Sequence, residues 1–151
     1  MPELTMTVDI DAPRDRVWNA LVDWDRQGEW MLLTEVRGGH GAGEKLEAYT
    51  GKRPLGFLDT MTITDWQPLR RAEVLHTGRL VRGSAAFELE ELPDGRTRFI
   101  WSEWLILPLG IVGELGFRIV RPLFVAGIAY SLRKFARWAP GHAPTTRALP
   151  G

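Results

Sequence analysis

Three ionisable residues, Asp59, His76 and Glu103, fall at positions of predicted strands that otherwise carry apolar side chains. Ionisable groups are rarely buried unless they are paired. A carboxyl group in an apolar environment has a raised pKa, and together with a histidine it can transfer protons near neutral pH. These three residues, the polar trio, are therefore candidate catalytic residues for acid–base chemistry.

The predicted strand pairing brings Asp59 close to His76. The turn after Trp66 predicts a hairpin in which residues 66 and 71 face each other, so that Met61 faces His76. Asp59 then lies diagonally from His76 on the same face of the sheet. Such diagonal neighbours are roughly 7–8 Å apart, which is within reach of long side chains.

The next hairpin brings Glu103 to the same face. The sequence PDG at 93–95 is a hairpin signal, and its register places Glu103 opposite Ala85, one strand away from His76. Because Ala85 and Gly83 are small, they leave open space between the histidine and the glutamate. The registers together predict a polar trio in an apolar cavity.

Three interpretations of the trio remain open. The acids can hydrogen-bond the histidine and one another, because structural ion networks also perturb pKa values. They can orient the polar end of a ligand inside an apolar pocket, as a few polar groups do in small-molecule sites. They can also catalyse proton transfer. The candidate ligand-binding residues are Asp59, Met61, His76, Ala85, Phe87, Phe99, Trp101, Glu103 and Arg118.

Hydrophobic periodicity predicts the elements that position these residues. Alternating apolar and polar side chains predict strands at 3–10, 33–37, 44–50, 57–66, 71–78, 81–91 and 96–106. Pro13 begins a predicted helix, and a second short helix is expected around Asp25–Met31. An antiparallel sheet with helices on one face is an α+β architecture. If the sheet curves strongly around one long helix, it can leave a cavity.

That long helix is predicted from residue 111 to residue 138. Apolar residues with the helical period are expected to form one core-facing stripe: Val112, Leu115, Ile119, Leu123, Ile128, Leu132 and Phe135. Pro122 is expected to kink or split the helix. Glu114, Arg118 and Arg121 interrupt the apolar run, which argues against a membrane span.

The glycine-rich segment Gly38–Gly43 resembles a phosphate-binding loop only superficially. Such a loop needs Gly-Lys-Ser/Thr and a helix after it, whereas here Glu44 precedes Lys45 and the following alternation predicts a strand. We therefore interpret the segment as a flexible connection between two strands, with His40 exposed to solvent.

Composition excludes several classes of protein. The chain has 151 residues, with 19 basic and 19 acidic side chains, so nucleic acid is not an expected partner. There is no cysteine, and the three histidines lack metal-ligand spacing, so we expect no metal or other cofactor. The N-terminus lacks signal-peptide features, which favours a cytoplasmic location. One domain is expected over 1–139, followed by a disordered tail at 140–151.

These patterns resemble the SRPBCC superfamily, which includes START lipid-transfer domains, the birch-pollen allergen family and polyketide cyclase/dehydrase-like proteins. The resemblance spans about residues 3–138 and rests on VDIDAPRDRVWNALVDWDRQGEW (8–30), the glycine segment, HTGRLVRGSAAFELEELPDGRTRFIWSEW (76–104) and RPLF (121–124). It implies a helix-grip fold, in which a curved seven-stranded antiparallel sheet wraps around the C-terminal helix, with two short helices after the first strand. By analogy, the glycine segment would be a mobile rim of the cavity.

The superfamily shares a cavity and not a chemistry, so three functions remain open. The first is binding, and possible transport, of a small hydrophobic molecule such as a lipid, isoprenoid or polyketide. The second is a cyclase, aromatase or dehydratase that uses the polar trio. The third is a protein-interaction module, for which the sequence shows no exposed apolar stripe. The chain is expected to be a monomer or a homodimer.

Overall fold

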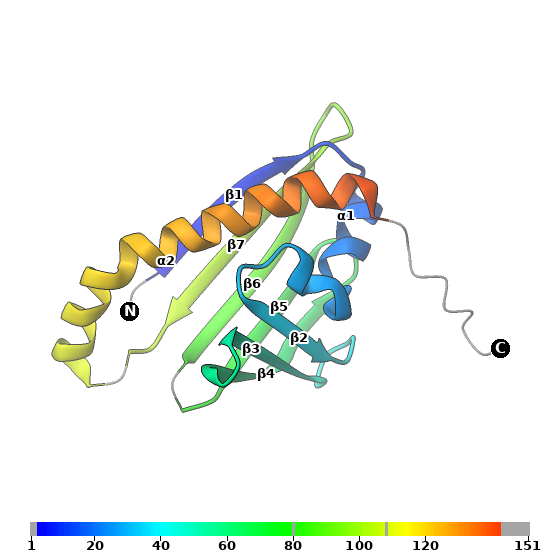
Figure 1. Ribbon diagram of the computed structural model, residues 1–151. Coiled ribbons are helices and arrows are strands. Elements are labelled where there is room, and N and C mark those ends of the chain that lie inside the picture. The colour runs from blue at the N-terminus through cyan, green and yellow to red at the C-terminus, as the bar shows by residue number, and fades with distance from the viewer. Residues whose placement is uncertain (1–2, 80, 108, 143–151) are drawn as a thin grey trace.

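The computed structural model describes residues 3–79, 81–107 and 109–142. Its elements follow the predicted order, and each strand begins and ends within two residues of its predicted bounds (Figure 1). The elements are β1 (Glu3–Ile10), α1 (Arg14–Leu21), the 3₁₀ helix η1 (Trp24–Glu29), β2 (Thr34–Gly38), β3 (Lys45–Lys52), β4 (Leu55–Gln67), β5 (Arg71–Thr77), β6 (Arg82–Glu91), β7 (Thr97–Leu105), α2 (Gly110–Trp138) and the 3₁₀ turn η2 (Ala139–Gly141).

The seven strands form one antiparallel sheet in the order β1-β7-β6-β5-β4-β3-β2. Figure 1 shows the sheet curling beneath α2, which runs along β1 and β7, and α1 beside the C-terminal end of α2. The predicted α+β helix-grip architecture is therefore confirmed. Because β1 pairs with the last strand, the two ends of the described fold are joined within the same sheet.

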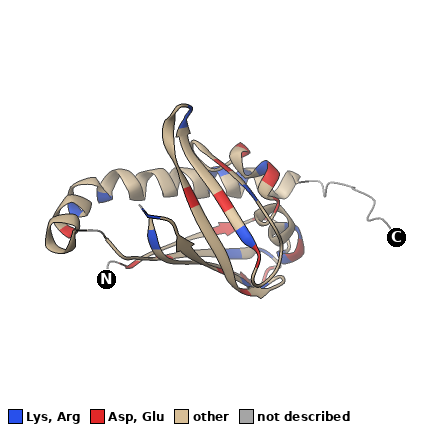
Figure 2. Cartoon of the chain, turned by 90° about the horizontal axis from the view of Figure 1, so that it is seen from below, with Lys and Arg blue, Asp and Glu red and all other residues tan. Residues whose placement is uncertain are grey.

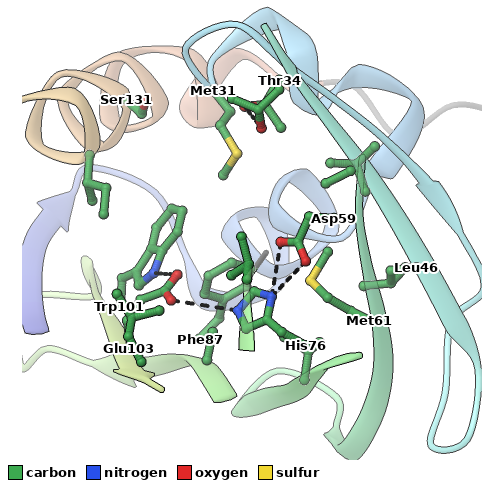
Figure 3. Close-up of a pocket in the computed structure, with 18 of the residues that line it drawn as sticks. Met31, Thr34, Leu46, Asp59, Met61, His76, Phe87, Trp101, Glu103 and Ser131 are labelled. Atoms are coloured by element: carbon green, nitrogen blue, oxygen red, sulfur yellow. Dashed lines mark hydrogen bonds and ion pairs between the residues drawn. The ribbon is translucent and has the colours of Figure 1, made fainter. Parts of the chain in front are cut away.

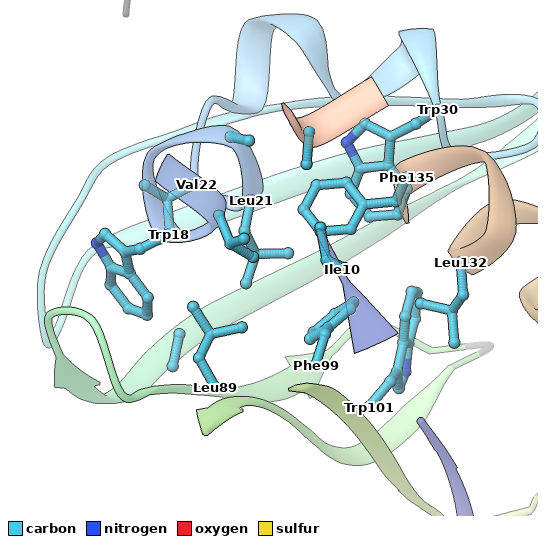
Figure 4. Close-up of a cluster of buried hydrophobic side chains, with 14 of the residues drawn as sticks. Ile10, Trp18, Leu21, Val22, Trp30, Leu89, Phe99, Trp101, Leu132 and Phe135 are labelled. Atoms are coloured by element: carbon cyan, nitrogen blue, oxygen red, sulfur yellow. The ribbon is translucent and has the colours of Figure 1, made fainter. Parts of the chain in front are cut away.

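The core lies where α1, η1 and the C-terminal half of α2 meet the inner face of the sheet (Figure 4). Phe135 and Trp30 are fully buried, with ring centroids 4.6 Å apart, and Phe135 also packs against Phe99. Ile10 and Leu21 are fully buried beside them. Each large apolar side chain buried in this way contributes about 1.5–3 kcal/mol. These contacts hold α1, η1 and α2 against the sheet at this end of the molecule.

The burial of helix α2 differs from the prediction. It runs without a break through Pro122, although Figure 1 shows its first turns, in yellow, pointing in a different direction from the rest. Ile128, Leu132 and Phe135 are buried as predicted, but Ile119 and Leu123 are 80% and 77% exposed. The prediction of one core-facing stripe is therefore wrong for the first half, because these turns project beyond the sheet.

The register between β4 and β5 is partly as predicted. Met61 faces His76 as expected, but at the turn it is Gln67 that pairs with Arg71, so the predicted pairing of residue 66 with 71 is wrong by one. A bulge between Ile63 and Asp65 compensates for the difference. The second register is confirmed, since Glu103 faces Ala85.

The glycine segment is held in place at the end of the sheet that carries α1 and η1. Trp24 Nε1 donates a hydrogen bond to the carbonyl of Gly39 (2.8 Å), and Gly43 N–H donates one to the carbonyl of Ile63 (2.8 Å). His40 is exposed, as expected, yet its ring stacks on Trp24. No residue of the segment lines the cavity among the residues described, so the prediction of a cavity rim is wrong.

The chain continues to make ordered contacts beyond residue 139. Residues 139–141 form η2, and His142 is buried, where its Nε2 lies 2.9 Å from the Asp23 carboxylate. The rest of the tail predicted to be disordered, residues 143–151, lies outside the described residues. The hydrogen bond to Asp23 ties the end of the helical region to the segment that follows α1.

Candidate functional site

A cavity of about 520 Å³ lies between the inner face of the sheet, the segment from η1 to β2, and α2. Most of its walls are apolar, and Figure 3 shows the polar trio projecting into it from the sheet. Seven of the predicted ligand-binding residues line it: Asp59, Met61, His76, Ala85, Phe87, Trp101 and Glu103. The curved sheet therefore leaves an interior that side chains do not fill.

Asp59 and His76 are joined across neighbouring strands. His76 Nδ1 donates a hydrogen bond to Asp59 Oδ1, and the Nδ1–Oδ1 distance is 3.0 Å. The pairing of Met61 with His76 makes this possible, because it places Asp59 at the diagonal position on β4. The side chains of His76 and Asp59 are 6% and 13% exposed, so the pair is largely shielded from water.

Glu103 approaches the other side of the histidine ring from β7. Strand β6 lies between β5 and β7, so the two side chains bridge two strand spacings, roughly 9.5 Å. They can do so because Gly83 and Ala85, the β6 residues between them, are small. Trp101 Nε1 donates a hydrogen bond to Glu103 Oε1 (3.1 Å), which holds the carboxyl group in place.

The contact between His76 and Glu103 is an ion pair without a hydrogen bond. His76 Nε2 lies 3.7 Å from Glu103 Oε2, which is longer than a hydrogen bond. This nitrogen is buried and has no hydrogen-bond partner among the described residues. A buried N–H without a partner loses the hydrogen bonds that water gave it, so the site has one unmet donor.

The environment of His76 favours its charged form. Burial by itself lowers the pKa of His76, but the hydrogen bond to Asp59 and the nearby Glu103 carboxylate outweigh burial, so its pKa is raised to about 9. The ring is therefore an imidazolium at neutral pH, and both of its nitrogens are donors. Sequence reasoning did not predict this raised pKa of the histidine.

Two predicted ligand-binding residues lie elsewhere. Phe99 is fully buried in the core, where it packs against Phe135, and it does not line the cavity. Arg118 is exposed on the first half of α2 and is also absent from the lining. The basic residue at the cavity wall is instead Arg82, at the start of β6. Helical spacing alone could not show that the first turns of α2 leave the sheet.

Sequence reasoning missed three further polar residues that line the cavity, Ser131, Gln27 and Thr34. Ser131 is buried in α2, accepts a hydrogen bond from the backbone N–H of Leu32 (3.0 Å), and donates one to the carbonyl of Gly127. Gln27 and Thr34 line the cavity from η1 and β2. A serine between Ile128 and Leu132 in an apolar stripe was the available signal for a helix that contacts another segment.

The family model for polyketide cyclase / dehydrase and lipid transport matches residues 1–140. The chain belongs to this family. The predicted resemblance to the SRPBCC superfamily is thereby confirmed. Among curated proteins the comparison finds no match.

Solved structures share the fold of this polyketide cyclase/dehydrase and lipid-transport family member. The Zhui aromatase/cyclase from Streptomyces sp. R1128 is 16% identical with a TM-score of 0.76, covering 91% of this chain and 93% of its own. TTHA0849 from Thermus thermophilus is 18% identical with a TM-score of 0.71, covering 91% and 97%. Protein NE0264 from Nitrosomonas europaea is 14% identical with a TM-score of 0.71, covering 89% and 92%. At these identities the likeness shows the fold alone.

Proposed function

We propose that this protein binds a small hydrophobic molecule that carries one polar group. The observation behind this proposal is the cavity of about 520 Å³, whose walls are apolar except for a few polar groups, chiefly the trio. Its volume falls in the usual range of ligand pockets, about 300–1,000 Å³. The membership of a family named for lipid transport as well as for cyclases supports the same function.

The trio favours a hydroxyl as the polar group of the ligand. Among the residues that the structure describes, His76 Nε2–H has no acceptor within hydrogen-bond distance, and the Glu103 Oε2 atom lies 3.7 Å away. A ligand hydroxyl near both atoms would accept a hydrogen bond from the imidazolium and donate one to the carboxylate. A carbonyl group could satisfy only the histidine. Lipids, isoprenoids and polyketides with a hydroxyl group are therefore the ligand class.

Native mass spectrometry of the purified protein, followed by analysis of an organic-solvent extract, tests this proposal. We expect an apolar compound at up to one molecule per chain. The Ala85→Phe variant places a ring in the cavity and should lose the bound mass, because Ala85 is a buried lining residue. The control Ala126→Phe adds the same ring at an exposed position of α2 and should keep it. Equal occupancy in both variants would contradict binding in the cavity.

A second candidate function is dehydration of a β-hydroxy carbonyl compound, favoured by the charged histidine between two carboxyl groups. Glu103 would remove a proton from the α-carbon, and His76 would protonate the departing hydroxyl group, so that a C–H and a C–O bond break, a C=C bond forms and water leaves. Asp59 would hold the imidazolium in position through Nδ1. This chemistry needs no group beyond the trio and the substrate.

Comparing turnover and ligand affinity of Glu103→Gln with those of the wild type separates the two functions. If the protein is a dehydratase, Glu103→Gln should lower turnover of a β-hydroxyacyl thioester by roughly 10²–10⁴-fold while its affinity changes little, because general acid–base catalysis contributes that much. If the protein only binds its ligand, neither the wild type nor the variant should turn over, and Glu103→Gln should weaken ligand binding alone.

A further inference from the structure

The cavity opens where its lining residues are exposed, at Phe57, Ile106 and Leu123, and this mouth carries exposed apolar side chains that no described element covers. On the first half of α2 they form an outward stripe, which we call the α2 stripe: Ile111, Val112, Leu115, Ile119 and Leu123. Across the mouth, Leu55 is 84% exposed on the β3–β4 hairpin, close in sequence to Phe57. Phe57 and Leu123 also line the cavity, so apolar side chains extend from the outside of the molecule into its interior.

The first half of α2 is amphipathic, and the α2 stripe is its exposed apolar face. Val112, Leu115, Ile119 and Leu123 repeat at three or four residues, which places them on one helical face. Glu114, Arg118 and Arg121 repeat in the same way on another face. Monomeric proteins rarely expose a contiguous apolar surface of this kind unless it contacts a partner or a membrane.

Basic residues surround this surface. Six of them lie at this end of the sheet or on the first half of α2: Lys52, Arg53, Arg79, Arg82, Arg118 and Arg121. The acidic residues at the same end are Glu3, Glu35 and Glu114, and of the six cations only Arg53 forms an ion pair among the described residues, to Glu35 at 4.0 Å. Figure 2 shows blue on the first turns of the long helix and on the strand ends near it. Since the chain has no net charge, this basic excess is local.

We propose that the cavity mouth docks on the surface of a lipid bilayer that contains anionic headgroups. An apolar helical face flanked by arginines is the pattern of helices that lie in the interface of a membrane. The stripe would enter the boundary between headgroups and acyl chains, and Arg118 and Arg121 would reach the phosphates. The inference rests on the proposed function, because the bilayer would then supply or receive the apolar ligand through a mouth that opens onto it.

The charge of this surface favours a bilayer over a second copy of the chain. A two-fold symmetric dimer brings the same surface of both copies together. It would therefore place two sets of mostly unpaired arginines near each other, and like charges across an interface are unfavourable. An anionic bilayer satisfies both the apolar stripe and the basic residues. In the part of the chain that the structure describes, no helix is long and apolar enough to cross the membrane itself.

Vesicle flotation of the full-length protein tests the docking. We expect the protein to float with vesicles of phosphatidylcholine containing about 30–40% phosphatidylglycerol, to bind pure phosphatidylcholine at least about tenfold more weakly, and to be released by high salt. Arg118→Glu/Arg121→Glu and Leu115→Ser/Ile119→Ser should each weaken binding by a similar factor. The control Arg133→Glu/Lys134→Glu reverses two charges at exposed positions of the second half of α2 and should float like the wild type.

Three results would overturn the docking proposal. The first is no flotation of the wild type at low salt, and the second is an equal loss in the control variant. The third is a wild-type dimer in analytical ultracentrifugation that Leu115→Ser/Ile119→Ser dissociates, because the stripe would then be an interface between copies. Thermal unfolding verifies that the variants fold. Extraction of a cavity-bound compound is measured separately, so an empty cavity in a protein that still floats would overturn the ligand proposal alone.

Discussion

At the scale of single residues, His76 holds a positive charge in an otherwise apolar cavity. Burying an ion costs several kcal/mol unless partners repay it, and here Asp59 and Glu103 are those partners. Asp59 makes the closer contact, through Nδ1, while Glu103 is held by Trp101 and remains at 3.7 Å. The histidine is therefore the residue that both acids contact.

The raised pKa of His76 makes stability depend on pH. The folded protein binds this proton with a pKa of about 9, above the ordinary value of 6.5. Protonation therefore adds stability that is fully present below pH 6.5 and is lost as pH rises through 9, by about 3 kcal/mol in total. Urea unfolding of the wild type and His76→Gln between about pH 6 and pH 9.5 measures this. Parallel pH profiles of the two proteins would contradict the assignment.

Removing one acid should lower the pKa of His76. In Asp59→Asn the hydrogen bond from Nδ1 to a carboxylate is lost, so burial and the single remaining carboxylate decide the pKa, and we expect it to fall by at least about one unit. Titration of the ring protons by NMR measures the change. Glu90→Gln, an exposed acid on β6, serves as the control and should leave the pKa where it is in the wild type. An unchanged value in Asp59→Asn would show that Asp59 does not stabilise the imidazolium.

At the scale of elements, Gly83 allows β6 to lie close to β7. Strand β6 lies between β5, which carries His76, and β7, which carries Glu103. The φ of Gly83 is +115°, and a Cβ built on it would clash with the carbonyl oxygen of Trp104. The neighbour is backbone and cannot move aside without distorting β7. A glycine at this position therefore fixes the strand geometry under the trio, in addition to leaving space above it.

We expect Gly83→Ala to destabilise the fold by at least about 2 kcal/mol, because the side chain adds a clash to an unfavourable φ. Gly116→Ala, in the first half of α2, meets no atom within 4 Å and should be neutral or stabilising by up to about 1 kcal/mol. Chemical denaturation of both variants measures the difference. A Gly83→Ala protein as stable as the wild type would mean that β6 and β7 can separate locally at little cost.

The elements show where sequence reasoning succeeds. Strand alternation placed Asp59, His76 and Glu103 on the inner face, since the period of two determines the face once the strand is recognised. The turn between β4 and β5 was predicted, but its length was not, because Leu69 adopts a positive φ of 69°, which its residue type does not signal. The predicted contact of Met61 with His76 is nevertheless correct, because the bulge in β4 offsets the shorter turn.

At the scale of the whole molecule, α2 belongs to two environments. Its second half packs against the core through Leu132 and Phe135, and its first half borders the cavity mouth. The helical period is the same in both halves, so the sequence could show that one face is apolar and not what that face contacts. What the apolar face contacts depends on where the sheet beneath the helix ends. That position is a property of the assembled fold.

The two halves of α2 should respond differently to the same substitution. Leu132→Ser removes a buried side chain and places a hydroxyl in the core, so we expect a loss of about 3–5 kcal/mol. Ile119→Ser changes a side chain that is 80% exposed and should alter stability by less than about 0.5 kcal/mol. Urea denaturation compares the two. Similar losses would show that the first half of α2 folds against a surface of its own chain.

The bulge in β4 has a consequence for how such proteins can diversify. Thr64 is the extra residue, and without it Ile63 and Asp65 would be adjacent while Met61 would still be opposite His76. Bulges increase the local twist of a strand, so gaining or losing this one residue reshapes the wall of the chamber without rewiring its polar contacts. Under the proposed function, the shape of the ligand cavity and the polar contacts within it can therefore change independently, by the gain or loss of one residue.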